Sequence, residues 1–67
     1  MKEPYRKFLK EKGYSINKLA NAIGMSHGGV ENALSNDIGR WRVDMLARIA
    51  KEFNLSIEEF YLMFRDK

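Results

Sequence analysis

Residues 15–35 (SINKLANAIGMSHGGVENALS) contain two short amphipathic stretches separated by Gly24, Met25 and Ser26. In the first stretch the apolar residues recur at i, i+3, i+4 and i+7, so they share one face of a helix. These residues are Ile16, Leu19, Ala20 and Ile23. The pattern predicts two helices with almost no linker between them.

Local signals around the break predict how the two helices begin and end. Ser15 and Ser26 each stand where a side-chain oxygen caps the first turn of a helix. Gly24 favours the left-handed conformation that ends a helix. Met25 and Val30 have the spacing of a hydrophobic staple, which fixes the angle at which the second helix begins. Two helices that meet across such a tight corner form a helix-turn-helix, a motif that reads DNA.

The rest of the chain predicts three more helices and no strand, so the expected fold class is an all-α, compact five-helix domain. The first helix begins near Pro4, a favoured position in a first turn, and ends at Gly13. Its apolar residues Tyr5, Phe8 and Leu9 are expected to be buried.

Two helices follow a loop over residues 36–41. The first of them has an apolar stripe that consists of Val43, Leu46, Ile49, Ala50 and Phe53. It ends near Asn54. Ser56 and Glu59 have the spacing of a capping box, which marks the start of the last helix.

Composition limits what else this chain can be. We expect one domain over residues 1–67, near the size at which a single core is only marginally stabilising. Because the chain has no cysteine and one histidine, we expect no metal site. We also expect no cofactor and no small-molecule ligand. It contains no run of about 18 apolar residues and no hydrophobic leader, so we expect a cytoplasmic protein without a membrane partner.

No group of residues points to an enzyme. His27 has Glu31 four positions later, which is more typical of a surface pair on a helix than of a general base. Gly24, Gly28 and Gly29 lack the spacing and the preceding strand of a dinucleotide-binding fingerprint. We therefore expect no catalytic activity.

The net charge of +3 is unevenly distributed. Residues 1–42 carry eight lysines and arginines against four acids, a balance of +4, whereas residues 43–67 carry four against five, a balance of −1. The positive charge therefore accompanies the helix-turn-helix, where phosphate contacts would need it. The alternative for Lys7, Lys10 and Lys12 is a solvated face of the first helix.

The chain resembles the small helical DNA-binding domains of phage repressor and Cro proteins and related bacterial regulators, the Xre-type family. The shared pattern extends over about residues 6–62 and includes IGMS at 23–26, LARIA at 46–50 and NLS at 54–56. The resemblance implies a third helix that enters the major groove of double-stranded DNA, commonly as a dimer on a two-fold symmetric operator.

Helical geometry and the resemblance together select candidate base-reading residues. At about 100° per residue, Gly28, Asn32 and Ser35 fall opposite the apolar side of the second motif helix. Asn32 is the strongest candidate because an amide pairs bidentately with adenine, and Ser35 suits a base or a phosphate. The resemblance assigns base contacts to His27 and Asn32, whereas Gly28 inherits only the position.

The sequence departs from the family at this helix. Relatives generally carry longer polar side chains where this chain has Gly28 and Gly29. Either the glycines let the backbone approach DNA closely, or the helix reads DNA weakly. Ile16 stands where many relatives have a polar residue that contacts phosphate, so that contact would move to Asn17 or to nearby backbone N–H groups.

Candidate phosphate contacts are polar or cationic residues on or beside the motif: Asn17, Lys18, Asn21, Ser26, Arg40 and Arg42. Capping alone also accounts for Ser26. Relatives use the stretch around Arg40 and Arg42 to reach the DNA backbone or the minor groove. Trp41 between them is expected to fill the core or its rim, because reading a duplex needs no unstacked base. Glu31 would repel phosphate, pair with a nearby cation, or accept from cytosine N4.

These observations predict a DNA-binding transcriptional regulator, a phage or mobile-element repressor or Cro-like protein that acts by occupying its operator. The alternative is a protein-interaction module on the same fold, such as an antirepressor or antitoxin-like partner. The scarcity of polar side chains on the second motif helix favours the protein-interaction module. The positive charge of residues 1–42 favours the DNA-binding regulator instead.

The last helix predicts a homodimer. Ile57, Phe60, Tyr61 and Phe64 form one face that can dock on the domain, while Leu62 and Met63 project away from it. A two-fold partner would bury Leu62 and Met63 and place two reading helices about one DNA turn apart. The residues expected at the contact are Tyr61, Leu62, Met63 and Phe64. The alternative is an ordinary exposed leucine and methionine.

Overall fold

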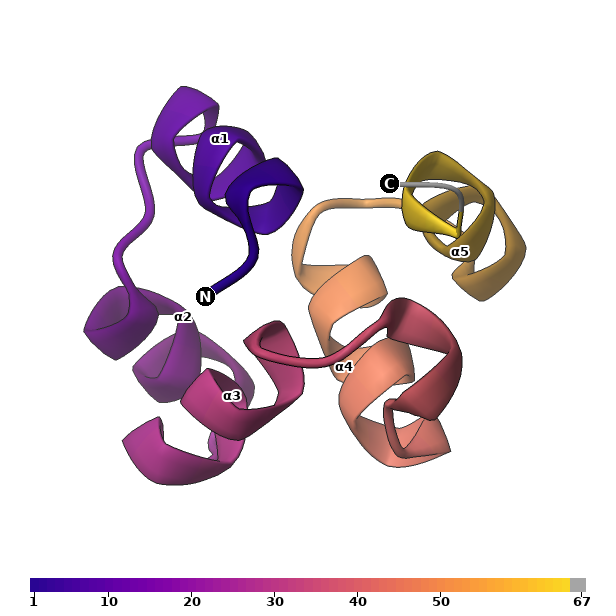
Figure 1. Ribbon diagram of the computed structural model, residues 1–67. Helices are drawn as coiled ribbons and strands as arrows, with labels where there is room; N and C mark the ends of the chain where they lie inside the picture. The colour runs from indigo at the N-terminus through magenta and orange to yellow at the C-terminus, as the bar shows by residue number, and fades with distance from the viewer. Residues whose placement is uncertain (66–67) are drawn as a thin grey trace.

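The computed structural model describes residues 1–65, which fold into five α-helices and one short 3₁₀ helix, with no strand in this part of the chain. The elements are α1 (Glu3–Glu11), α2 (Ile16–Ile23), α3 (His27–Leu34), η1 (Ile38–Arg40), α4 (Val43–Glu52) and α5 (Ile57–Phe64). Figure 1 shows α1 and α5 at the top, with α2 and α3 below α1 and α4 below α5. The predicted all-α five-helix fold is confirmed.

The helix ends are set by the residues that the sequence suggested. The hydroxyl oxygens of Ser15, Ser26 and Ser56 each accept the backbone N–H three residues later, at 3.1, 3.1 and 3.0 Å. Ser56 and Glu59 complete the capping box, because the Glu59 carboxylate accepts the Ser56 N–H at 3.0 Å. Asn54 has a positive φ of 59° just after α4, the left-handed conformation in which a helix commonly ends.

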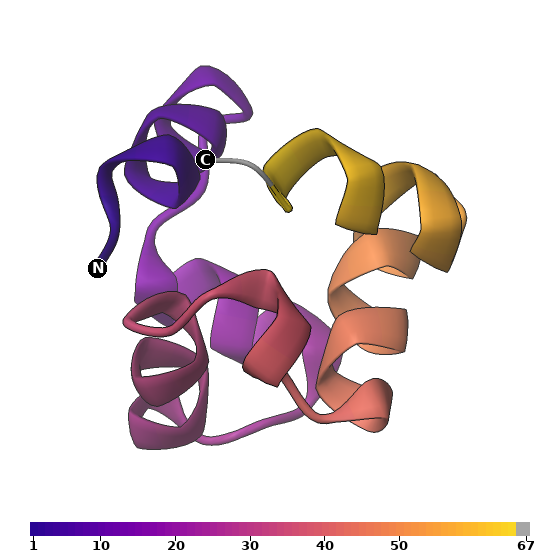
Figure 2. The ribbon, with the colours of Figure 1, turned by 45° about the vertical axis from the view of Figure 1, so that its right-hand side comes forward.

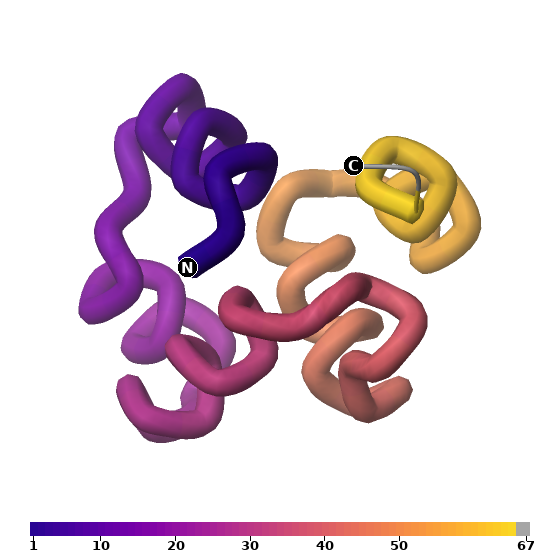
Figure 3. Tube along the Cα trace, in the orientation of Figure 1, coloured from indigo at the N-terminus to yellow at the C-terminus, as the bar shows by residue number. Residues whose placement is uncertain are grey.

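The core lies between all five helices. Its largest fully buried side chains are Phe60, Leu19, Ile49 and Val30. Trp41 is only 8% exposed and packs against Phe60, with ring centroids 5.9 Å apart, so its interpretation as a core residue is confirmed. The segment that leads from α3 into α4 crosses the domain through η1 (Figures 2 and 3).

Three details of the sequence interpretation need correction. Val43 is 74% exposed and does not belong to the buried stripe of α4, whereas Met45 is buried. The reason is its position along the helix. Val43 is the first residue of α4 and precedes the turn that packs on the core. Phe8 is half-buried rather than buried, and its ring packs edge-on against Phe53, 4.9 Å away. The predicted loop contains the 3₁₀ turn η1.

The docking face of α5 is narrower than expected. Phe60 and Phe64 are buried, but Ile57 and Tyr61 are 43% and 37% exposed. The ring of Phe64 lies 5.1 Å from that of Tyr5 and 5.4 Å from that of Phe8, so Phe64 is part of the domain's own core, while its place at a dimer contact stays a prediction. Leu62 and Met63 are 49% and 39% exposed, as the sequence suggested.

Candidate nucleic-acid interface

The corner between α2 and α3 fixes the direction of α3. Gly24 adopts φ 70°, and the N–H of Met25 donates to the Ala20 carbonyl at 3.0 Å, which closes the end of α2. Met25 packs half-buried against the core, while Val30 on α3 is fully buried. The side of α3 that carries Val30 is therefore held against the domain, and the opposite side faces solvent.

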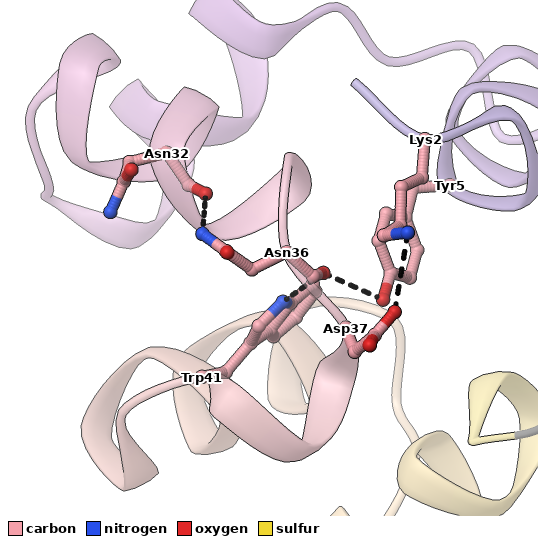
Figure 4. Close-up of polar contacts among 6 residues, drawn as sticks. All are labelled: Lys2, Tyr5, Asn32, Asn36, Asp37 and Trp41. Atoms are coloured by element: carbon pink, nitrogen blue, oxygen red, sulfur yellow. Dashed lines mark hydrogen bonds and ion pairs between the residues drawn. The ribbon is translucent and has the colours of Figure 1, made fainter.

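That opposite side, the outer face of α3, consists of His27, Gly28, Glu31 and Asn32, all of them exposed. The side-chain amide of Asn32 points away from the body of the domain (Figure 4). It carries both a donor and an acceptor, as a bidentate contact with adenine requires. The geometry thus makes the predicted base readers accessible, while whether they contact bases stays a prediction.

Ser35 makes a hydrogen bond within α3 that the sequence did not predict. Its hydroxyl donates to the Glu31 carbonyl at 3.0 Å, a bond back along α3 that satisfies one of the last carbonyls of the helix. In this arrangement the Ser35 oxygen is left to accept, but not to donate, a hydrogen bond from DNA.

The candidate phosphate-contacting residues on α2 and at the N-cap of α3 differ in the contacts that they already make within the domain. Asn17 and Asn21 are exposed. The Lys18 ammonium donates to the Gly13 carbonyl at 3.3 Å and lies 4.7 Å from the Tyr14 ring centre, so it would leave these contacts to reach a phosphate. Ser26 accepts the Gly29 N–H, which leaves its own O–H able to donate to an anion.

Arg40 and Arg42 lie beside α3 across a small hollow that they line together with Asn32, Asn36 and Trp41. Both arginines are exposed. The Arg42 Nε atom is 3.4 Å from the Asp44 carboxylate, but the Arg42 side chain is 84% exposed, so this ion pair is weak. The structure therefore brings the predicted base reader Asn32 next to both predicted phosphate-contacting arginines.

Sequence reasoning missed the residues that hold the end of α3. The Tyr5 hydroxyl and the Trp41 Nε1–H both donate to the backbone carbonyl of Asn36, at 3.1 and 3.2 Å (Figure 4). Burial raises the pKa of the Tyr5 hydroxyl and the nearby Asp37 charge raises it further, while a backbone hydrogen bond from Ile38 opposes them. The sequence feature that could have indicated these contacts is the polar group of each aromatic side chain, which needs a hydrogen-bond partner when the ring is buried.

Neither a membrane-spanning helix nor a metal site is found in the described part of the chain. Within residues 1–65 no helix has the length and apolar character needed to cross a bilayer. The same residues contain no cluster of three or more histidine and acidic side chains that could hold a metal ion.

A family model described as the Cro/C1-type HTH DNA-binding domain matches residues 6–63, nearly the same extent as the pattern noted in the sequence. No curated protein and no solved structure matches the chain. The matched region includes α2, α3 and the segment that carries Arg40 and Arg42.

Proposed function

The chain belongs to the Cro/C1-type HTH DNA-binding domain family, and from this premise we propose that it is a repressor or Cro-like regulator that acts by occupying a double-stranded DNA operator. The observation that carries the proposal is the solvent-facing amide of Asn32 on an α3 that is buried along its other side. A helix held in this way can enter the major groove without rearranging the core.

In the proposed complex, the two kinds of contact have separate roles. Asn32 pairs with an adenine, and His27 contacts a neighbouring base edge or phosphate. Arg40 and Arg42, which flank the same hollow, neutralise phosphates and set the register of α3 on the duplex. Occupancy of the operator then blocks access of the transcription machinery.

We also propose that the regulator is a homodimer that pairs through α5. Tyr61, Leu62 and Met63 are three consecutive exposed residues of this helix, and a 67-residue domain gains stability when a partner covers such residues. Two-fold symmetry would place the two α3 helices on half-sites about 34–36 Å apart.

Sedimentation of a Leu62→Glu, Met63→Glu double variant tests the dimer. We expect the wild type to dimerise and the double variant to be monomeric, with weaker binding to a two-half-site duplex. The control is Val43→Glu, which places one glutamate at an exposed valine on α4. A monomeric wild type, or dissociation by the control alone, contradicts pairing through α5.

Selection of bound fragments from a random duplex pool tests the DNA-binding proposal. We expect recovery of a preferred sequence, and binding to it that weakens steeply as salt rises. A second candidate function is a protein-interaction module. The lack of side chains at Gly28 and Gly29, in the first turn of α3, favours this candidate. Absence of salt-dependent binding to any duplex would favour that candidate over the regulator.

A further inference from the structure

The backbone carbonyl of Asn36 receives two side-chain hydrogen bonds from separate parts of the chain. The Tyr5 hydroxyl comes from α1, at 3.1 Å, and the Trp41 Nε1–H comes from just beyond η1, at 3.2 Å. Their side chains are buried, with 4% and 8% of each residue exposed, and their ring centres lie 5.3 Å apart. Because a carbonyl has two lone pairs, both of its acceptor positions are used.

Asn36 also holds the last turn of α3 directly. Its backbone N–H donates to the Ala33 carbonyl at 3.0 Å, and its side-chain amide donates to the Asn32 carbonyl at 2.8 Å (Figure 4). One residue therefore connects the backbone of Asn32, the proposed base reader, to the buried rings of Tyr5 and Trp41.

The start of α1 adds a second connection to the same place. The Lys2 backbone N–H donates to the Leu34 carbonyl at 2.9 Å, and the Lys2 ammonium lies 3.2 Å from the Asp37 carboxylate. The ion pair is partly exposed and weak, but the backbone bond satisfies a carbonyl at the end of α3 that has no partner within the helix. Residues of α1 and its N-cap thus contact α3 at its C-terminal end.

This anchoring matters because α3 has little stability of its own. The helix has only eight residues, and two of the first three are glycines, which disfavour a helix. A bidentate amide contact requires placement to within about 0.5 Å and 10–20°. Contacts with the rest of the domain must therefore supply the precision that the helix lacks.

We propose that Tyr5 is a positioning residue for DNA readout, which holds Asn32 in its reading orientation through the carbonyl and amide of Asn36. The proposal rests on the proposed function, because it assumes that Asn32 contacts a base. Tyr5 itself touches no DNA. Losing its hydrogen bond lets the end of α3 adopt other orientations, and affinity for the preferred site falls by the fraction of molecules that leave the reading orientation.

Tyr5→Phe removes only the hydroxyl, so the ring contacts with Trp41 and Phe64 remain. The matched control is Tyr14→Phe, which removes the hydroxyl that donates to the Glu52 carboxylate at the end of α4. Affinities for the preferred duplex and for a random duplex of equal length are measured by fluorescence anisotropy at several salt concentrations. The fold is checked by thermal unfolding of each variant.

We expect Tyr5→Phe to lower the ratio of preferred to random affinity about two- to tenfold, the scale of one net hydrogen bond, with an unchanged salt slope. Tyr14→Phe should leave the ratio unchanged. In an Asn32→Ala background, Tyr5→Phe should lower the ratio no further, because the residue through which it acts is gone.

Each other outcome is informative. An unchanged ratio for Tyr5→Phe, an equal fall for Tyr14→Phe, or a further fall in the Asn32→Ala background overturns the positioning role while DNA binding stands. Failure of the wild type to bind any duplex instead contradicts the proposed function, and the positioning role with it.

Discussion

Replacing Gly28 by alanine separates what the fold needs at this position from what DNA binding needs. Gly28 is the second residue of α3, its φ is not positive, and a Cβ atom built on it would meet nothing within 4 Å. The free protein therefore has no steric or conformational reason for glycine here. A glycine that the fold does not require is a candidate for close approach to another molecule.

The stability of the free protein should rise in this variant. Alanine favours a helix interior by about 0.8–1.0 kcal/mol over glycine, and by less in the first turn. We expect a gain of about 0.5 kcal/mol in the free energy of unfolding, which in a domain of this size corresponds to about 2–4 °C in Tm.

Binding should change in the opposite direction. If the first turn of α3 touches DNA at Gly28, the added methyl group occupies space that the duplex fills in the complex. Forcing one extra methyl group into a packed contact costs about 1–3 kcal/mol, so affinity for the preferred duplex should fall about five- to 150-fold.

Thermal unfolding and fluorescence anisotropy on the same preparations measure both effects. Gly29→Ala is the control for the cap, because a Cβ at Gly29 would lie 3.0 Å from the Ser26 oxygen that accepts the Gly29 N–H. Any gain in helix propensity there is offset by disturbance of a cap worth about 1 kcal/mol. A more stable Gly28→Ala variant that binds DNA as tightly as the wild type would refute close approach and favour a weakly reading helix.

Three further predictions follow from the site and the helix caps. Asn32→Ala should cost about 1–3 kcal/mol on the preferred duplex and almost nothing on random DNA, measured by anisotropy, and equal losses on both would remove Asn32 from base readout. Arg40→Ala or Arg42→Ala should weaken binding to all sequences and lower the salt slope by about one, whereas an unaltered slope would exclude that arginine from phosphate contact. The bond from the Ser56 N–H lowers the pKa of Glu59 below its ordinary value of 4.5, so its ionised form stabilises the fold above pH 4.5, and this contribution is lost as pH falls through the lowered pKa. Glu59→Gln should therefore flatten acid destabilisation in that window, as urea unfolding from pH 2.5 to 7 would measure, and identical pH profiles would contradict the assignment.

Helix ends were predictable from the sequence because their chemistry is local. Ser15, Gly24, Ser26 and the Ser56 capping box act within three or four residues of their own position, so spacing alone identifies them. The outward direction of Asn32 followed in the same way from the period of the α-helix. Local rules therefore defined most of the fold and the accessible side of α3.

Burial at helix margins was not predictable, because it depends on which neighbour covers each turn. Val43 and Ala50 lie seven residues apart on α4 and therefore point in nearly the same direction, yet the first is 74% exposed and the second 1%. Periodicity gives the direction of a side chain but not where along the helix the covering element ends. Tyr61 and Phe64 on α5 differ for the same reason.

The carbonyl of Asn36 shows a second limit, which concerns hydrogen-bond partners rather than burial. The sequence indicates that Tyr5 and Trp41 need acceptors, but the acceptor is a backbone atom 31 residues from Tyr5, and any carbonyl could have served. Backbone acceptors carry no residue signature, so contacts of this kind emerge only from the folded chain. In this domain the contacts to the Asn36 carbonyl lie at the C-terminal end of α3, whereas Gly28 and Gly29 lie at its start. The start of α3, where Gly28 and Gly29 carry no side chain, is also the end with the weaker helix propensity. The contacts at the C-terminal end of α3 therefore add to the precision of readout.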